Sequence, residues 1–327
     1  MARVAVVFTG GTISTVFDSV AGGNVPTLDG AAILARTPGL DEIAEVIAID
    51  RGRTPASHFT FPALLEIAGV LRKAIADPSI DGAVVVQGTD TIEETAFLWD
   101  LVLDDAKPVV VTGAMRASDE AGFDGPANLR DSVRVAAAPS MRGAGVVVCL
   151  AGTVEPADDV VKMHASALDT FTSPNGGSLG RVGAGEVALF RHRAGRRHVE
   201  TTRAAERVHL ITATVAMDGA LLDAALAAGA DGIVVAATGA GNTDPRLLAA
   251  AEPAIAAGLP VALATRCPSG RAGVAYAFPG GGATWVRAGA LPVGHLCAVK
   301  ARVALALGLG AGLDRDGLAA LLADPLP

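Results

Sequence analysis

Two short stretches of small polar residues, each directly after an apolar run, carry residue types suited to nucleophilic chemistry. The first is Thr9-Gly10-Gly11-Thr12, and the second is Gln87-Gly88-Thr89-Asp90. A threonine hydroxyl is a weak nucleophile at neutral pH and needs a base to take its proton. A lysine can be that base when burial and neighbours lower its pKa, whereas an adjacent carboxylate favours the charged lysine. The alternative is that Thr89 and Asp90 only form a turn and cap a helix.

The pattern around the second stretch predicts where it lies in a fold. Residues 84–86 are all valine, which suits a strand buried on both faces. Thr91 and Glu94 have the spacing of a capping box, which predicts a helix start. A strand that turns at once into a helix places the turn at the carboxyl edge of a parallel sheet, where open α/β folds bind ligands. We therefore expect Thr89 and Asp90 to face a small molecule.

The order of the other patterns predicts an α/β protein with a layered sheet of parallel strands in a larger N-terminal domain and a smaller C-terminal α/β domain. We place the catalytic N-terminal domain at residues 1–190, a linker at 191–207 and the second domain at 208–327. Before the linker, strands are expected at 3–8, 44–49, 84–86, 108–112 and 145–150, and helices at 30–36, 62–76, 93–104 and 127–138. A hairpin is expected near 187–190, and a mobile loop at 14–29. Beyond the linker, strands are expected at 208–214, 232–237 and 260–264, and helices at 221–228, 246–257 and 299–307.

Composition excludes several classes of function. The 327 residues are 51% hydrophobic and 18% charged, so a substantial core is expected. The net charge of -8 argues against nucleic acid, and the basic patch at 191–197 is interpreted as a solvated linker. No apolar run approaches about 18 residues and the chain enters a strand at once, so neither a membrane span nor a signal peptide is expected.

The cysteines and histidines do not predict a metal site. Cys149, Cys267 and Cys297 are far apart, so we expect reduced, mostly buried thiols in a cytoplasmic protein. The six histidines show no ligand spacing. The glycines of the first turn match neither a phosphate loop nor the dinucleotide-binding fingerprint.

Several motifs together resemble the bacterial-type L-asparaginase family. They are TGGTI at residues 9–13, QGTDTIEETA at 87–96, KPVVVTGAMR at 107–116 and DGPANL at 124–129. The resemblance covers nearly the whole chain, and the combination is highly specific although TGGT alone is weak.

The resemblance implies an amidohydrolase that converts L-asparagine to L-aspartate and ammonia through a threonine acyl-enzyme, without a cofactor or metal. Its catalytic residues would be Thr12 as the primary nucleophile, with Thr89, Asp90 and Lys162 as a second group. Its substrate-binding residues would be Gly11, Ser57, His58, Gly88, Asp90, Ala114 and Asn242. In this scheme Lys162 is the base or proton relay, and Asp90 also binds the α-amino group of the substrate. Ser57 holds the α-carboxylate, and the Ala114 carbonyl holds the amide.

The resemblance also implies partners. Members of the family form homodimers, usually paired into homotetramers, with sites at the subunit interface. Asn242 matches a residue that a neighbouring subunit supplies. The partners expected are therefore a small-molecule substrate and a second copy, with no nucleic acid and no membrane.

The chain departs from the family pattern at three places. Gln87 stands where a histidine is frequent, residues 14–29 contain no tyrosine, and residues 253–313 contain neither Asp nor Glu, so a carboxylate from the partner is missing. His58 also lies where glutamine is common. Tyr276, the only tyrosine, is a hypothetical accessory group that reaches across the interface to the nucleophile, with a purely structural interface tyrosine as the alternative.

Two other functions remain open at this stage. One is an amino-acid-binding sensor that has kept the fold and lost catalysis, which the missing tyrosine and carboxylate support. The other is the ammonia-supplying subunit of a tRNA-dependent amidotransferase, which the acidic composition disfavours. Glutamine differs from asparagine by one methylene, so some glutaminase activity is compatible with the sequence.

Overall fold

The structure is a computed structural model that describes residues 1–193 and 195–325. It divides into two compact units, Met1–Arg196 and Arg197–Pro327, and each is described by itself. Residue 194 in the predicted linker and residues 326–327 at the end of the predicted second domain lie outside the described residues. The domain limits at 190 and 208 stay predictions.

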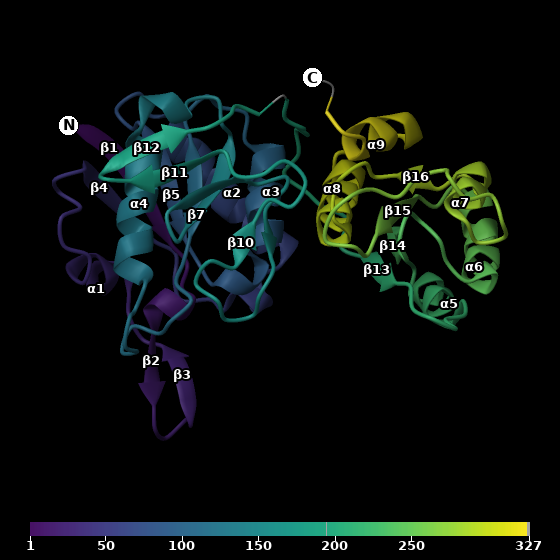
Figure 1. Ribbon diagram of the computed structural model, residues 1–327, viewed down its shortest axis with the longest axis horizontal. Coiled ribbons are helices and arrows are strands. Elements are labelled where there is room, and N and C mark those ends of the chain that lie inside the picture. Colours follow the sequence, from purple (N-terminus) through teal and green to yellow (C-terminus); the bar gives the residue numbers. More distant parts are fainter. Residues whose placement is uncertain (194, 326–327) are drawn as a thin grey trace. The chain divides into compact units, whose positions relative to one another are not determined.

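The first unit is built on an eight-stranded sheet with the order β12-β11-β8-β7-β6-β5-β1-β4 (Figure 1). Its strands are β1 (Ala2–Phe8), β4 (Ala44–Asp50), β5 (Gly82–Val86), β6 (Val109–Thr112), β7 (Val146–Leu150), β8 (Thr153–Pro156), β11 (Gly180–Gly183) and β12 (Glu186–Leu189). Strands β4, β1, β5, β6 and β7 are mutually parallel, which confirms the layered parallel sheet expected from the sequence. Strands β8, β11 and β12 extend it in antiparallel fashion.

Helices cover both faces of this sheet. Helix α4 (Gly125–Ala137) packs on one face, where alternate valines of the strands form a core with Leu129 and Val133. Helices α2 (Phe61–Ala76) and α3 (Ile92–Val102) pack on the other face, and α1 (Gly30–Ala35) lies against β4. The two faces explain why the central strands are apolar at every position rather than at alternate ones.

The start of α3 differs from the expected capping box. The Thr91 side chain does not cap the helix, and its hydroxyl donates instead to the Ala56 carbonyl at 3.3 Å. A 3₁₀ turn, η3 (Thr89–Thr91), precedes α3. The predicted helix start is confirmed, since Thr91 is the N-cap residue of α3, but the expected side-chain cap is absent because the Thr91 hydroxyl binds a neighbouring turn. This contact joins two loops at the same edge of the sheet.

The segment expected to be a mobile loop at residues 14–29 contains a β-hairpin. Strands β2 (Thr15–Asp18) and β3 (Gly23–Pro26) pair with each other and project from the body of the first unit (Figure 1). A second small sheet pairs β9 (Val161–Lys162) with β10 (Phe171–Thr172). The remaining 3₁₀ turns are η1 (Thr12–Ser14), η2 (Ala56–His58) and η4 (Pro139–Met141).

The basic patch is not a solvated linker. The Arg193 side chain is 5% exposed and binds the buried Asp100 at 2.8 Å and Asp158 at 2.9 Å. Arg196 also pairs with Asp100 at 3.1 Å. Burial disfavours a charged Asp100, but the charge and hydrogen bonds of Arg193, together with Arg196, outweigh it and hold the pKa of Asp100 below its ordinary 3.8. The sequence interpretation failed because composition cannot show that α3 contains a buried acidic partner.

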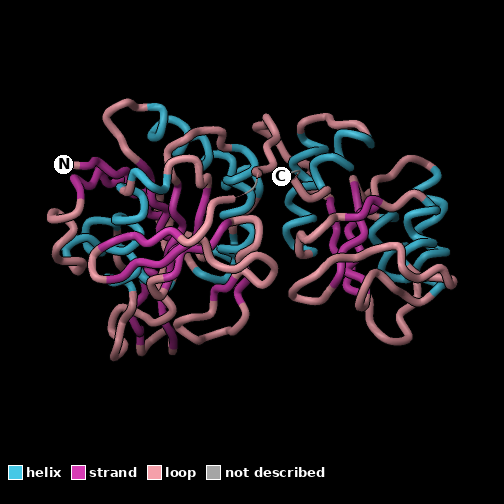
Figure 2. The backbone as a smooth tube through the Cα atoms, turned by 45° about the horizontal axis from the view of Figure 1, so that its top comes forward, coloured by secondary structure: helices cyan, strands magenta, loops and turns pink. Residues whose placement is uncertain are grey.

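The second unit has a four-stranded parallel sheet with helices on both faces (Figure 2). Its strands are β13 (Val208–Thr212), β14 (Gly232–Ala237), β15 (Val261–Thr265) and β16 (Leu291–Pro292). Its helices are α5 (Ala220–Ala227), α6 (Pro245–Ala256), α7 (Gly282–Ala288), α8 (Ala298–Gly310) and α9 (Arg315–Leu322). Helix α8 packs on one face with α9 beside it, whereas α5, α6 and α7 cover the other. The smaller α/β unit is thus confirmed, although α7 and α9 were not predicted.

The cysteines and the length of the helices were also considered in the sequence analysis. All three cysteines are free, but only Cys149 is buried, because Cys267 lies in an exposed turn and Cys297 is partly exposed. Burial raises the pKa of Cys149 to about 12, so its thiol is inert at neutral pH. Among the described residues, every helix is too short or too polar to cross a bilayer.

Candidate active site

The carboxyl ends of three neighbouring strands bring the predicted turns to one edge of the first sheet. Phe8 of β1 is in register with Val86 of β5, which in turn is in register with Thr112 of β6. The Thr9 N–H and hydroxyl both donate to the Val86 carbonyl, at 2.9 and 3.0 Å. The Gln87 N–H donates to the Thr112 carbonyl at 3.0 Å. The turns after β1, β5 and β6 therefore begin side by side at the carboxyl edge of the sheet.

Glycine allows the turns that carry Thr12 and Thr89 to touch. Gly11 has φ 92° and ψ −175°, a conformation that other residues rarely adopt. A Cβ at Gly11 would overlap the backbone of Gly88, so no side chain fits between these turns. Ser14 and Thr15 fix the η1 turn, since their hydroxyls donate to the carbonyls of Gly11 and Thr12 at 2.6 and 2.8 Å. Thr12 is partly exposed at the start of this turn.

Lys162 joins Thr89 and Asp90 in a compact polar cluster. Its Nζ lies 2.9 Å from the Thr89 Oγ1 and 3.1 Å from an Asp90 carboxylate oxygen. The lysine side chain is 13% exposed and Thr89 is 4% exposed, whereas the Asp90 side chain is 72% exposed. The arrangement lets an ammonium group exchange a proton with a buried hydroxyl, while the carboxylate remains open to a ligand.

The first turn of α3 fixes the strand that carries Lys162. The Lys162 backbone N–H donates to a Glu93 carboxylate oxygen at 3.2 Å. On its other side, Lys162 is paired with Phe171 in the β9–β10 sheet. Sequence reasoning did not assign Glu93 a role, although the residue lies inside the motif at 87–96.

Ser57 and His58 lie on η2, which contacts η3. Both side chains are exposed, so they are open to a ligand at this edge. Their turn is held through Ala56, whose carbonyl accepts the Thr91 hydroxyl and whose Cβ lies beside Gly88. The structure therefore places Ser57 and His58 on the turn next to the Thr89 cluster.

Ala114 is buried in the turn after β6, and two polar residues of α4 and its N-cap hold that turn. Asp124 accepts the N–H groups of Met115 and Arg116 at 3.0 Å. The Asn128 amide donates to the Gly113 carbonyl at 3.0 Å and to Asp124 at 2.8 Å. Asp124 and Asn128 were quoted in the DGPANL motif but not assigned to the site, and the motif was the signal for them.

Asn242 and Tyr276 belong to the second unit. Asn242 closes a tight turn, because its N–H donates to the Thr238 carbonyl at 2.9 Å. The Asn242 Oδ1 is buried and accepts no hydrogen bond within the described part of the chain. Tyr276 is 47% exposed, and its ring lies 5.7 Å from that of Phe278.

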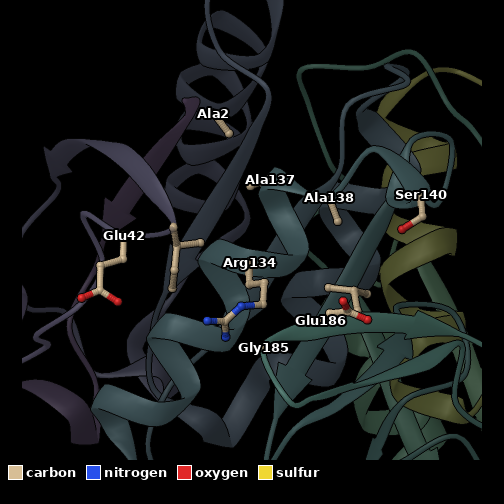
Figure 3. A pocket seen from close by; sticks show the side chains of 10 residues that line it. Ala2, Glu42, Arg134, Ala137, Ala138, Ser140, Gly185 and Glu186 are labelled. Carbon is tan, nitrogen blue, oxygen red and sulfur yellow. The ribbon is translucent and has the colours of Figure 1, made fainter.

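A separate hollow of about 550 Å³ lies at the opposite end of β1. Figure 3 shows Ala2, Glu42, Arg134 and Glu186 around it. None of the predicted site residues lines this hollow, so it is not the candidate site. Among the described residues, no cluster of three or more His, Cys, Asp or Glu side chains is suited to hold a metal ion.

Comparison with known proteins places the chain among enzymes. The family described as "Asparaginase, N-terminal" matches residues 3–195, and "Glutaminase/Asparaginase C-terminal domain" matches residues 207–322. A "Probable L-asparaginase" of Deinococcus radiodurans is 37% identical over 324 residues, covering 97% of this chain and 95% of that protein. An "L-asparaginase" of Bacillus licheniformis is 32% identical, covering 93% of this chain and 94% of the relative.

A solved structure agrees with these sequence matches. The crystal structure of "Probable Cytoplasmic L-asparaginase from Campylobacter jejuni" has a TM-score of 0.87 and 28% identity, covering 98% of this chain and 99% of that one. Since the two family descriptions account for most of the sequence and the relatives span it almost end to end, this chain belongs to the asparaginase family.

Proposed function

We propose that this protein is an L-asparaginase that hydrolyses the side-chain amide of L-asparagine to L-aspartate and ammonia. The observation that carries the proposal is the contact of Lys162 with Thr89 and Asp90, at the edge where Gly11 meets Gly88. The relatives named as asparaginases favour hydrolysis over a sensor or an amidotransferase subunit. Some hydrolysis of L-glutamine is also proposed, because one methylene provides only about 1–3 kcal/mol of discrimination.

In the proposed reaction, the Thr12 Oγ attacks the amide carbon and gives up its proton. The carbon–nitrogen bond breaks, and the nitrogen leaves as ammonia after it receives that proton. Water then adds to the resulting ester, which releases aspartate and returns a proton to Thr12. The Lys162–Thr89 pair is the proposed relay that activates this water.

The other predicted residues have proposed binding roles. Asp90 would hold the α-amino group, for which its 72% exposed side chain is available. Ser57 would hold the α-carboxylate with His58 beside it, and the Ala114 carbonyl would hold the amide nitrogen. Backbone N–H groups of the two turns would stabilise the oxyanion, each worth a few kcal/mol in comparable sites.

We further propose that a second copy of the chain completes the site. Ser57, His58 and Asp90 are exposed within the first unit, whereas a hydrolase site gains from exclusion of bulk water. Asn242 would come from that copy in a homodimer or homotetramer, and Tyr276 stays an accessory hypothesis. A cytoplasmic location is also proposed, in agreement with three free cysteines and with the description of the Campylobacter relative.

Steady-state ammonia release from L-asparagine, L-glutamine and D-asparagine tests the activity. L-Asparagine should have the highest kcat/KM, and Thr12→Ala and Thr89→Val should each lose most activity. A wild-type protein that binds L-asparagine without releasing ammonia would be a sensor. Full activity of Thr89→Val would contradict the two-group scheme.

Cross-linking and light scattering test the assembly. The expected result is a dimer or tetramer. In addition, inactive Thr12→Ala chains mixed with inactive Asn242→Ala chains should regain activity. Failure of this complementation, with both variants folded and mixed oligomers formed, would contradict a shared site.

A further inference from the structure

Gln87 lies directly beneath the proposed active-site turn, at a position where the chain departs from the family motif. Its side chain is completely buried. The Gln87 Nε2 donates to the Gly88 carbonyl at 3.1 Å, and its Oε1 accepts the Thr95 hydroxyl at 3.0 Å. Both oxygen and nitrogen of this amide are therefore used in a buried place, where hydrogen bonds are strong and an unpaired group is costly.

Its two partners fix the orientation of this amide. The Gly88 carbonyl can only accept a hydrogen bond, so the amide nitrogen must face it. The Thr95 hydroxyl then donates to the amide oxygen. Thr95 lies on α3 and is itself buried, so the link anchors the turn to a rigid helix.

The Gly88 carbonyl shares a planar trans peptide with the Thr89 N–H, and the two groups point in opposite directions. When Gln87 holds the carbonyl toward the interior, the Thr89 N–H is directed away from it. This N–H is the first of the η3 turn and has no acceptor within that turn. The hydrogen bonds described for residues 1–193 and 195–325 give it no other acceptor.

A glycine at this position leaves the following peptide free to respond to such a restraint. Gly88 has no Cβ to limit rotation of the peptide that follows it. Its close contacts with Gly11 and Ala56 fix its position, and the hydrogen bond from Gln87 acts on the carbonyl itself.

We propose that Gln87 is a positioning residue which, with Thr95, sets the Gly88–Thr89 peptide so that the Thr89 N–H faces the reacting carbonyl. The inference rests on the proposed amidase function and deepens it. The restraint would matter most in the transition state, when negative charge develops on the carbonyl oxygen.

Substitutions of similar shape test the role. Gln87→Glu keeps an acceptor for Thr95 but, when ionised, places a carboxylate against the Gly88 carbonyl. Its kcat should fall about 10- to 100-fold at pH 8 with KM within threefold. The kcat relative to wild type should recover as the pH is lowered, because a protonated glutamic acid can again donate to Gly88. A buried carboxyl in apolar surroundings is protonated more readily than an exposed one.

Two substitutions of Thr95, one without and one with a hydroxyl, test the same link without introducing a charge. Thr95→Val removes the hydroxyl with little change of volume and should lower kcat about tenfold. Thr95→Ser keeps the donor and should recover at least a third of wild-type kcat. Thermal unfolding is measured in parallel so that folded enzyme is compared throughout.

The outcomes separate the two proposals. If the wild type releases no ammonia from L-asparagine, the proposed function fails. If the wild type is active but folded Thr95→Val and Gln87→Glu keep kcat within twofold at pH 8, the positioning role is wrong. Equal losses in Thr95→Val and Thr95→Ser, or a Gln87→Glu defect that does not change with pH, would likewise assign Gln87 a packing role only.

Discussion

The ammonium nitrogen of Lys162 lies 2.9 Å from the hydroxyl oxygen of Thr89, although 73 positions separate the two residues in the chain. The strand β9 that carries Lys162 has only two residues, and Glu93 anchors its backbone. The contact therefore depends on a short element held by the helix that follows Thr89. This makes the lysine the most direct point at which to test the proton relay.

Replacing Lys162 by methionine should lower kcat about 10²- to 10⁴-fold, the range that general acid–base groups contribute. The side-chain volume is similar, so the substitution removes the charge and proton donor with little loss of packing. The measurement is ammonia release with L-asparagine, together with thermal unfolding. Lys73→Met, at an exposed position of α2, is the control and should keep wild-type kinetics. Comparable kcat values for the two variants would exclude Lys162 from the relay.

Gly11→Ala should lower kcat/KM by about 10²-fold, because the added Cβ must push apart the turns that carry Thr12 and Thr89. Its φ of 92° adds backbone strain of roughly 1–3 kcal/mol. Gly22→Ala is a control for adding a methyl group to a glycine of positive φ where there is open space. That glycine also has a positive φ, 69°, but a Cβ there meets nothing within 4 Å. If Gly22→Ala reduced kcat/KM as much as Gly11→Ala, the loss would not be specific to the approach of the two turns.

Asp124→Asn should raise KM for L-asparagine by about tenfold with a smaller change in kcat. The carboxylate accepts backbone N–H groups of the Ala114 turn and the Asn128 amide with its two oxygens. An asparagine amide has only one oxygen and cannot accept all of these hydrogen bonds. The turn would then hold the Ala114 carbonyl less rigidly for the substrate amide. Steady-state kinetics measure the effect, with Asp131→Asn on the same helix as control. An unchanged KM in a folded Asp124→Asn protein would contradict this role.

Sequence patterns predicted the central strands and the two threonine turns, since runs such as residues 84–86 combine β-branched side chains with an abrupt polar turn. They did not find Lys162, which the family resemblance alone supplied, because a two-residue strand has no periodicity to recognise. Strands β8 and β11 were missed because their sequences, TVEP and GRVG, contain no apolar run, whereas β6 has the same length but reads VVVT.

The polar network around Asp100 was beyond sequence reasoning for another reason. Asp100 lies in a helix whose neighbours are buried, and Arg193 lies 93 positions away in a segment rich in charge. From local composition alone, such a charged segment is interpreted as exposed to solvent. Only the tertiary fold reveals that both charges are buried together.

The Asp100–Arg193 pair predicts how stability depends on pH. The pKa of Asp100 is lowered in the folded protein. Its ionised form therefore contributes stability that is complete above the ordinary pKa of 3.8 and is lost as the pH falls through the folded pKa.

Asp100→Asn should lower the free energy of unfolding at pH 7 by about 3–5 kcal/mol, because Arg193 and Arg196 lose their buried counter-charge. Urea unfolding at pH 7 and at pH 3 or below measures both effects. The gap between wild type and Asp100→Asn should narrow at the lower pH, where the wild-type carboxylate begins to be protonated. Asp223→Asn, at an exposed position of α5, should match wild type at both pH values. A gap that stays constant with pH would show that Asp100 acts through packing rather than through its charge.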